Sequence, residues 1–202
     1  MAREKIISMG AEAILLKTEF CGKKALLKLR SPKEYRDKAL DLRIRTQRTK
    51  TEALMLHKAK LCGVRTPIVY AVSRKECGIT MEFIEGRKLK DCLSGKTLWA
   101  CREAGKLAAK LHGAGIIHGD LTTSNLIIAP EGVVFVDFGL SGQSNDREAE
   151  AVDLIGFKKT YFATHWRYPK GWKEFLAGYD SVSKAKWMEE KIAEIEARAR
   201  YV

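Results

Sequence analysis

The sequence lacks the features that define membrane-spanning, disulfide-linked and zinc-binding proteins. Ser8, Gly10 and Glu12 interrupt the apolar residues near the N-terminus before they reach the length of a signal peptide or a membrane span. The five cysteines form no Cys-x-x-Cys pair, and the four histidines stand at no spacing typical of zinc ligands. We therefore expect no membrane contact, free thiols and a cytoplasmic location.

Acidic residues are scarce between residues 23 and 50, and the whole chain carries a net charge of +12. Eleven lysines and arginines fall in this stretch, against only Glu34, Asp37 and Asp41. Such a run is typical of a solvated helix face. It is also typical of a surface for RNA phosphates, because clustered cations release the counterions that are condensed on a polyanion. Charge alone leaves both interpretations open.

Hydrophobic spacing divides the chain into a β-rich first part and a helical second part. In the first part we expect one long helix at residues 37–61 and strands at residues 5–8, 13–19, 25–29, 68–72 and 78–83. In the second part we expect a hairpin of residues 126–128 and 133–136, and helices at 98–112, from about 147, and at 181–200. The fold class is therefore α+β, with a β-rich N-terminal lobe at residues 1–84 and a helical C-terminal lobe at residues 85–202.

The strongest local signal is His-Gly-Asp-Leu-Thr-Thr-Ser-Asn at residues 118–125, followed by Asp-Phe-Gly at residues 137–139 after an apolar strand. Phosphoryl transfer needs a carboxylate that orients and deprotonates the attacking hydroxyl, and oxygen ligands that hold magnesium against the phosphates. Asp120 fits the first role, and Asn125 and Asp137 fit the second. His118 is expected to pack and hydrogen-bond the catalytic loop. The order and spacing predict a protein-kinase-type active site that uses ATP.

A kinase-type lobe would also supply a phosphate-binding lysine, a partner carboxylate, a hinge and a covering turn. Lys28 lies in the apolar segment Ala-Leu-Leu-Lys-Leu, where a buried cation needs a partner, and Glu52 on the long helix is the best-placed carboxylate. We count both with Asp120 as catalytic residues. Backbone groups of Glu82 and Ile84 would contact adenine at the hinge. The turn over the phosphates would consist of Ser8, Met9, Gly10, Ala11, Glu12 and Ala13.

Two features of regulated protein kinases are missing. Gly119 stands where those enzymes carry an arginine before the catalytic aspartate, and no Ala-Pro-Glu-type signature follows Gly139. The two absences agree, because a clamping arginine is not required when there is no phosphorylated loop to clamp. Thr122 replaces the lysine that usually lies two residues after the catalytic aspartate in Ser/Thr kinases, so water is a credible acceptor besides a protein hydroxyl. We expect an open active site, or one that a partner completes.

Over nearly its whole length the chain resembles the small atypical kinase subunit of the KEOPS complex. The resemblance includes Gly-Ala-Glu-Ala at residues 10–13, Arg48-Thr49 before Glu52, the block at 118–125 and Ala-Val-Asp-Leu at 151–154. It implies a minimal two-lobed protein-kinase-like fold and an atypical Ser/Thr kinase or ATPase. The C-terminus departs from the family's basic Arg-Gly-Arg tail, because residues 196–202 read Glu-Ala-Arg-Ala-Arg-Tyr-Val.

The resemblance further implies ATP with Mg²⁺ or Mn²⁺, in support of threonylcarbamoyladenosine synthesis in transfer RNA. The implied partners are the threonylcarbamoyl-transferase subunit, a small accessory KEOPS subunit and transfer RNA, which the basic stretch at 23–50 would face.

Three other interpretations share part of this pattern. Small-molecule phosphotransferases of the antibiotic- or choline-kinase type also place His-Gly-Asp before a metal-binding asparagine, but the strong positive charge argues against them. Rio-type kinases also lack the activation segment, although the Thr-Thr-Ser block favours the KEOPS subunit. A catalytically idle RNA-binding scaffold would have no need to retain the full set of predicted active-site residues.

Overall fold

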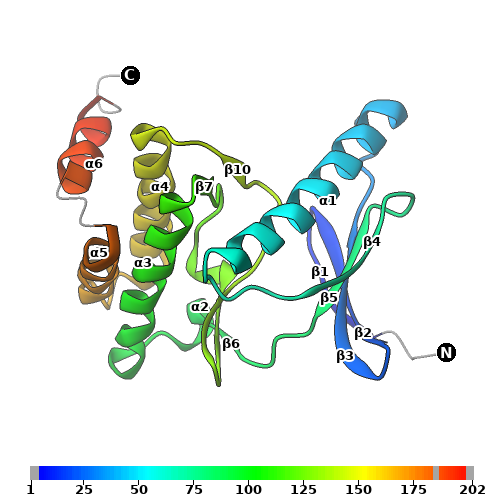
Figure 1. Ribbon diagram of the computed structural model, residues 1–202, viewed down its shortest axis with the longest axis horizontal. Helices are drawn as coiled ribbons and strands as arrows, with labels where there is room; N and C mark the ends of the chain where they lie inside the picture. Colours follow the sequence, from blue (N-terminus) through cyan, green and yellow to red (C-terminus); the bar gives the residue numbers. More distant parts are fainter. Residues whose placement is uncertain (1–4, 184–186, 199–202) are drawn as a thin grey trace.

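The computed structural model describes residues 5–183 and 187–198, and these form two lobes (Figure 1). The first lobe is an antiparallel five-stranded sheet with the strand order β1-β2-β3-β5-β4, packed against one long helix. Its elements are β1 (Lys5–Met9), β2 (Ala13–Phe20), β3 (Lys23–Arg30), α1 (Lys38–Leu61), β4 (Val69–Ser73) and β5 (Gly78–Glu82). The predicted sheet with one inserted helix is confirmed.

Turn and cap residues explain where these elements begin and end. Cys21 and Gly22 both have positive φ, at 49° and 76°, which is the backbone twist that a two-residue hairpin between β2 and β3 requires. Asp37 caps α1 by accepting the backbone N–H of Leu40 at 3.0 Å. Beyond the helix, Gly63 adopts φ +80°, a conformation that glycine allows without strain.

Short strands in the second lobe hold the loops that carry the predicted catalytic residues. β7 ends one residue before His118, β8 begins directly after Asn125, and β9 ends two residues before Asp137. These strands form a β10-β7 pair and a β6-β8-β9 sheet. The elements of the lobe are β6 (Arg87–Lys88), α2 (Leu89–Cys92), η1 (Gly95–Thr97), α3 (Leu98–Gly113), β7 (Ile116–Ile117), η2 (Thr123–Asn125), β8 (Leu126–Ala129), β9 (Gly132–Phe135), β10 (Gly142–Gln143), α4 (Arg147–His165), α5 (Lys170–Ser183) and α6 (Trp187–Arg198).

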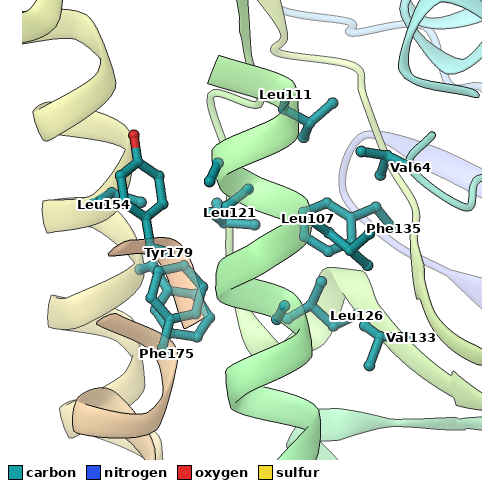
Figure 2. Close-up of a cluster of buried hydrophobic side chains, with 14 of the residues drawn as sticks. Val64, Leu107, Leu111, Leu121, Leu126, Val133, Phe135, Leu154, Phe175 and Tyr179 are labelled. Atoms are coloured by element: carbon teal, nitrogen blue, oxygen red, sulfur yellow. The ribbon is translucent and has the colours of Figure 1, made fainter. Parts of the chain in front are cut away.

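The core of the second lobe is built around α3. Leu107 and Leu111 of this helix lie on the side of Val64 and Phe135, while Phe175 and Tyr179 of α5 pack on its opposite side (Figure 2). Glycines allow the helices to approach closely, since a Cβ on Gly105 would lie only 1.9 Å from the Phe175 carbonyl oxygen. The same buried cluster extends to Leu56, Ile79 and Met81 of the first lobe. The two lobes therefore share one continuous apolar core.

One helix prediction was wrong, and it concerns residues 181–200. Residues 181–183 end α5, and α6 spans only Trp187–Arg198. Because α5 packs against α3 whereas α6 packs against α4, the two segments bury separate faces and cannot form one helix with one apolar stripe. Residues 184–186 and 199–202, which include the end of the unusual C-terminal tail, lie outside the described residues. The lobe boundary at residues 84 and 85 stays a prediction. Among the described helices, none has the length and apolar character needed to cross a membrane.

Candidate active site

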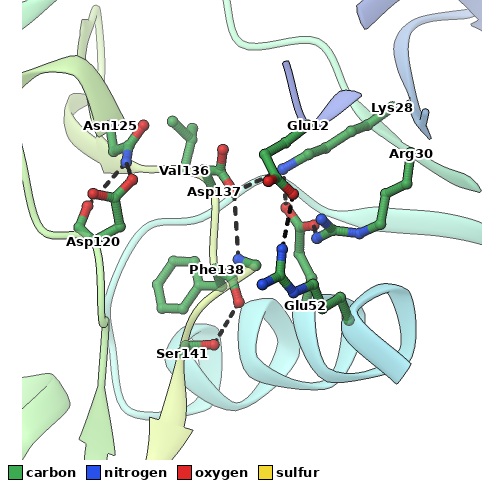
Figure 3. Close-up of polar contacts among 12 residues, drawn as sticks. Glu12, Lys28, Arg30, Glu52, Asp120, Asn125, Val136, Asp137, Phe138 and Ser141 are labelled. Atoms are coloured by element: carbon green, nitrogen blue, oxygen red, sulfur yellow. Dashed lines mark hydrogen bonds and ion pairs between the residues drawn. The ribbon is translucent and has the colours of Figure 1, made fainter. Parts of the chain in front are cut away.

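Three of the predicted residues form one connected ion-pair cluster. The Lys28 ammonium donates to Glu52 Oε1 and to Asp137 Oδ1, at 2.7 Å each (Figure 3). Lys28 and Glu52 are buried, whereas the side chain of Asp137 is 47% exposed. Residues from β3, α1 and the loop after β9, up to 109 positions apart in sequence, thus meet at a single ammonium group.

Arg30 is a further member of this cluster that sequence reasoning missed. Its Nη2 lies 2.5 Å from Glu52 Oε2, and only 6% of the residue is exposed. The available signal was its position two residues after Lys28, because alternate residues of a strand point to the same face. The apolar segment Ala-Leu-Leu-Lys-Leu draws attention to Lys28 alone, because Arg30 lies just outside it and is one of eleven basic residues in the stretch 23–50.

The backbone at Asp137 is held in an uncommon conformation. Asp137 has φ +62°, in the left-handed region that non-glycine residues rarely adopt. The positive φ is at Asp137 itself and not at Gly139 two residues later. Gly139 serves a different need, because a Cβ there would lie 2.7 Å from Arg30 Nη2. Its N–H also donates to Asp137 Oδ1 at 3.3 Å.

The environment of Asp137 keeps its carboxylate ionised. Burial alone would raise the pKa of this group, but the charge and hydrogen bond of Lys28, the Gly139 N–H and the charge of Arg30 together lower it below the usual range. An ionised carboxylate that projects into an open cavity is a suitable oxygen ligand for a divalent cation.

Asp120 and Asn125 form a second, adjoining pair. The Asn125 amide nitrogen donates to both the backbone oxygen and the Oδ2 of Asp120, at 2.9 Å each (Figure 3). The amide nitrogen is therefore oriented toward the Asp120 loop, and the amide oxygen is left as an acceptor or metal ligand. Asp120 itself is exposed to the cavity, as a group that must reach an acceptor has to be.

Buried side chains hold the catalytic loop in place. His118 is fully buried against Phe138, at a ring-centroid distance of 4.6 Å, and burial lowers the pKa of its imidazole. Its Nδ1 accepts the Asp120 N–H and its Nε2 faces the Val136 oxygen, both at 3.3 Å, which assigns the proton of the neutral ring to Nε2. The structural role expected for His118 matches these contacts.

Asp153 of α4 supports the same loop. Its carboxylate accepts the backbone N–H groups of His118 and Gly119 at 2.9 Å each, and contacts His112 Nε2 at 3.1 Å. His112 in turn contacts the Tyr179 hydroxyl at 2.9 Å, so the network reaches α5. The sequence offered Asp153 only as part of a family motif, and no spacing rule linked it to the catalytic loop.

The backbone also explains the glycine before the catalytic aspartate. Gly119 has φ +77°, and a Cβ at this position would lie 2.3 Å from the Leu140 carbonyl oxygen. The short segment after Asp-Phe-Gly therefore packs directly on Gly119, where regulated kinases place an arginine side chain.

Two adjoining cavities contain nearly all predicted binding residues. The first, of about 400 Å³, is lined by Ser8, Gly10, Ala11, Glu12, Ala13, Leu15, Lys28, Arg30, Arg48, Asp120, Asp137, Gly139 and Leu140. The second, of about 180 Å³, is mainly apolar and includes Leu15, Leu26, Lys28, Glu52, Met81, Glu82, Phe83, Ile84, Asn125, Ile127, Val136 and Asp137. Leu15, Lys28 and Asp137 line both. Met9 lines neither and is 70% exposed, so the structure does not bring it into the site.

The turn over the first cavity is fixed by side chains from other elements. Gly10 donates its N–H to the Ala13 oxygen at 3.0 Å, which closes the turn. Lys33 donates to the Ala11 oxygen, and Arg48 of α1 pairs with Glu12 at 2.8 Å. These interactions hold the turn over the cavity although it contains a single glycine.

Glu82 lies at the end of β5 and lines the second cavity, and its side chain, for which no role was predicted, forms a salt bridge. Its carboxylate pairs with Arg65, which also contacts Glu131 of the second lobe at 3.0 Å. Burial would raise the pKa of Glu82, but the hydrogen bonds from Arg65 and from the backbone of Ile68 outweigh it and lower the pKa. Since the Glu82 N–H also donates to the Ile68 oxygen, only its carbonyl is left for the cavity.

The oxygen donors fit a metal that is held largely by phosphates and water. Asn125 and Asp137 offer one amide and one carboxylate, and the described residues contain no group of three or more His, Cys, Asp or Glu able to hold a metal ion. Mg²⁺ commonly keeps several waters and binds through one or two protein oxygens plus substrate phosphates. The residues present therefore fit Mg²⁺ bound together with a nucleotide.

Comparison with known proteins gives consistent matches. The RIO domain family model matches residues 18–155. The chain is 42% identical to KEOPS complex subunit Bud32 of Pyrococcus abyssi, covering 98% of this chain and 96% of that protein. It is 41% identical to a probable bifunctional tRNA threonylcarbamoyladenosine biosynthesis protein of Methanosarcina mazei, of which it spans only 36%.

Among solved structures, the Rio2 kinase of Chaetomium thermophilum, in an ADP/Mg²⁺-phosphoaspartate complex, matches with a TM-score of 0.69. The match covers 100% of this chain and 72% of that chain at 16% sequence identity, which establishes the protein-kinase-like fold. The family match and the near full-length identity establish the rest: the chain belongs to the RIO-domain family and, within it, to the family of KEOPS complex subunit Bud32.

Proposed function

We propose that the protein is an atypical Ser/Thr kinase and ATPase that transfers the terminal phosphoryl group of ATP. The proposal depends on one observation: the Lys28 ammonium binds both Glu52 and Asp137, and the cavity beside it is also lined by Asp120. A buried lysine shared by two carboxylates, one of which lines the same cavity as the candidate general base, suits phosphoryl transfer.

Each residue has a separable task in this reaction. Lys28 would turn from Asp137 to the phosphates, and Glu52 would keep it oriented. Asn125 and Asp137 would hold Mg²⁺, which would offset the negative charge of the phosphates. Asp120 would accept the proton of the attacking hydroxyl or water. The Rio2 kinase of similar fold, whose complex contains ADP and Mg²⁺, supports the choice of nucleotide and metal.

The nucleotide would lie across the two cavities. The mainly apolar cavity beside β5 has the character of an adenine site, with the Glu82 carbonyl and the Ile84 backbone as hydrogen-bonding groups. The larger cavity under the turn at residues 8–13 carries Lys28, Arg30 and Arg48, whose charges suit phosphates. This arrangement would direct the terminal phosphate toward Asp120.

The names of the relatives support a role in transfer RNA modification. We place the chain in a KEOPS-type assembly with a threonylcarbamoyl-transferase subunit and a small accessory subunit, where its ATP turnover serves threonylcarbamoyladenosine synthesis. Of the eleven basic residues at 23–50, Lys28 and Arg30 are buried in the site. Exposed members such as Lys38, Arg43 and Lys50 would face transfer RNA.

Phosphate release and protein labelling distinguish the two acceptors. The full chain is incubated with γ-labelled ATP and Mg²⁺, first alone and then with its transferase partner and transfer RNA. Partner-stimulated phosphate release with little protein labelling identifies water as the acceptor. Steady labelling of the chain or its partner identifies a protein hydroxyl. The absence of both phosphate release and protein labelling under every condition would overturn the proposed function.

A further inference from the structure

Glu52 is shared by two buried cations. Lys28 Nζ donates to its Oε1 at 2.7 Å, and Arg30 Nη2 donates to its Oε2 at 2.5 Å (Figure 3). The side chains of Lys28, Arg30 and Glu52 are 9%, 5% and 1% exposed. Both oxygens of one buried carboxylate are therefore occupied, each by a different residue of the same strand.

The cluster is electrically balanced only because Arg30 is present. Lys28 and Arg30 carry two positive charges, and Glu52 and Asp137 carry two negative charges. Without Arg30, a single ammonium would neutralise two carboxylates, and Lys28 would be the only cation on buried Glu52 while it turned from Asp137 to a phosphate. An unpaired buried carboxylate is strongly unfavourable, so Lys28 would be retained by the protein and would be less available to a ligand.

Arg30 is also held at the correct place by its own backbone. Its N–H donates to the Cys77 oxygen at 3.1 Å, and its carbonyl accepts from Arg45 Nη1 at 3.4 Å. Arg45 is fixed to Asp41 of α1 at 2.6 Å. The guanidinium lies against Gly139, lines the larger cavity, and has a buried Nε without a partner among the described residues. An arginine suits this task because it remains charged and planar when buried.

We propose that Arg30 is a positioning residue for the nucleotide phosphates. It keeps one oxygen of Glu52 paired, and thereby lets Lys28 turn from Asp137 to the phosphates. The proposal rests on the proposed function, because it assumes that Lys28 contacts phosphate. It also predicts a specific pattern of binding: Arg30 acts on ligands that carry phosphates and is neutral toward the adenine end of the site.

The test measures binding of ATP and of adenosine to the full-length wild type, Arg30→Met and Arg30→Lys, with the exposed Arg74→Met as the matched control. Removal of one charge-assisted interaction predicts that Arg30→Met weakens ATP binding about tenfold, while adenosine binding stays within about twofold. Arg30→Lys recovers part of the affinity, and Arg74→Met behaves as wild type. Equal ATP affinity in Arg30→Met and wild type would overturn the proposal, as would equal reductions for ATP and adenosine.

A double-mutant cycle with Glu52→Gln tests whether Arg30 acts through Glu52. If it does, the Arg30 substitution adds little to the reduction of ATP affinity already caused by Glu52→Gln. Additive reductions would contradict the mechanism. Should Arg30→Met fail to fold, the cycle is carried out with Arg30→Lys. A wild-type chain that binds no ATP would instead remove the proposed function, so the two failures are distinguishable.

Discussion

The carboxylate of Asp153 accepts the backbone N–H of Gly119 at 2.9 Å, which ties α4 to the residue directly before the catalytic aspartate. The same carboxylate accepts the His118 N–H and contacts His112. Burial opposes the charge of Asp153, but the hydrogen bond and charge of His112, and then the His118 groups, outweigh it and lower its pKa. Asp153 therefore stabilises the folded chain in its ionised form.

Replacing Asp153 with Asn is expected to destabilise the protein. The amide cannot accept both backbone N–H groups in the same way, and an unsatisfied buried donor costs about 1–3 kcal/mol. Because the folded pKa is lowered, the contribution of Asp153 is complete above the unfolded pKa of about 3.9 and disappears as the pH falls through the folded value. Urea unfolding at pH 7 and in acid should show a large deficit for Asp153→Asn at pH 7 that narrows in acid. The exposed Asp91→Asn is the control, and equal stability of both variants at pH 7 would refute this role.

Gly139→Ala tests the close approach of the Asp-Phe-Gly turn to Arg30. The added Cβ would lie 2.7 Å from Arg30 Nη2 and 3.2 Å from Asp137 Oδ1, so one of these groups must move. Displacement of an active-site group by a fraction of an ångström predicts a reduction of turnover of about tenfold or more. Gly142→Ala is the matched control, because a Cβ there meets nothing within 4 Å. Steady-state ATP turnover of the two variants decides the point, and similar rates would mean that the cluster tolerates the added methyl group.

Charge reversal on α1 tests the transfer RNA surface. Arg43, Arg45 and Arg48 all belong to the basic stretch at 23–50, but Arg45 pairs with Asp41 and Arg48 pairs with Glu12. Exposed Arg43 and Lys50 are therefore the informative positions. Arg43→Glu and Lys50→Glu should weaken transfer RNA binding and flatten its dependence on salt, with the slope falling by roughly one for each phosphate that is no longer neutralised.

Charge reversals elsewhere on the surface provide the control for this experiment. Lys96 and Lys173 are also exposed but lie in the second lobe, away from α1. Lys96→Glu and Lys173→Glu should leave the salt slope of transfer RNA binding unchanged. Equal effects in both pairs of variants would indicate that only net charge matters and would remove the argument for α1.

Sequence reasoning reached the parts of the site that are local in the chain. The block at 118–125, the Asp-Phe-Gly turn and Lys28 on β3 follow from motif spacing and strand pattern, and the structure brings them together. Arg30 and Asp153 were not assigned roles, because their partners lie 22 and 34 or more positions away and are set by packing alone. The salt bridge of the Glu82 side chain could not be predicted from the sequence either, since its partner Arg65 comes from the loop after α1. Hydrophobic periodicity could likewise not separate α5 from α6, because the two helices are distinguished by their packing partners, α3 for α5 and α4 for α6.

Asp120→Ala provides the most direct test of phosphoryl transfer by this site. Asp120 is exposed in the cavity, and its proposed task of accepting a proton is separate from the phosphate-binding task of Lys28. ATP affinity is measured by titration and turnover by phosphate release, for the wild type, Asp120→Ala and the exposed Asp91→Ala control. We expect nearly unchanged ATP affinity in Asp120→Ala, with turnover reduced by about 10²-fold or more. Retained turnover, or the disappearance of ATP binding together with turnover, would contradict the role of Asp120 as the catalytic base.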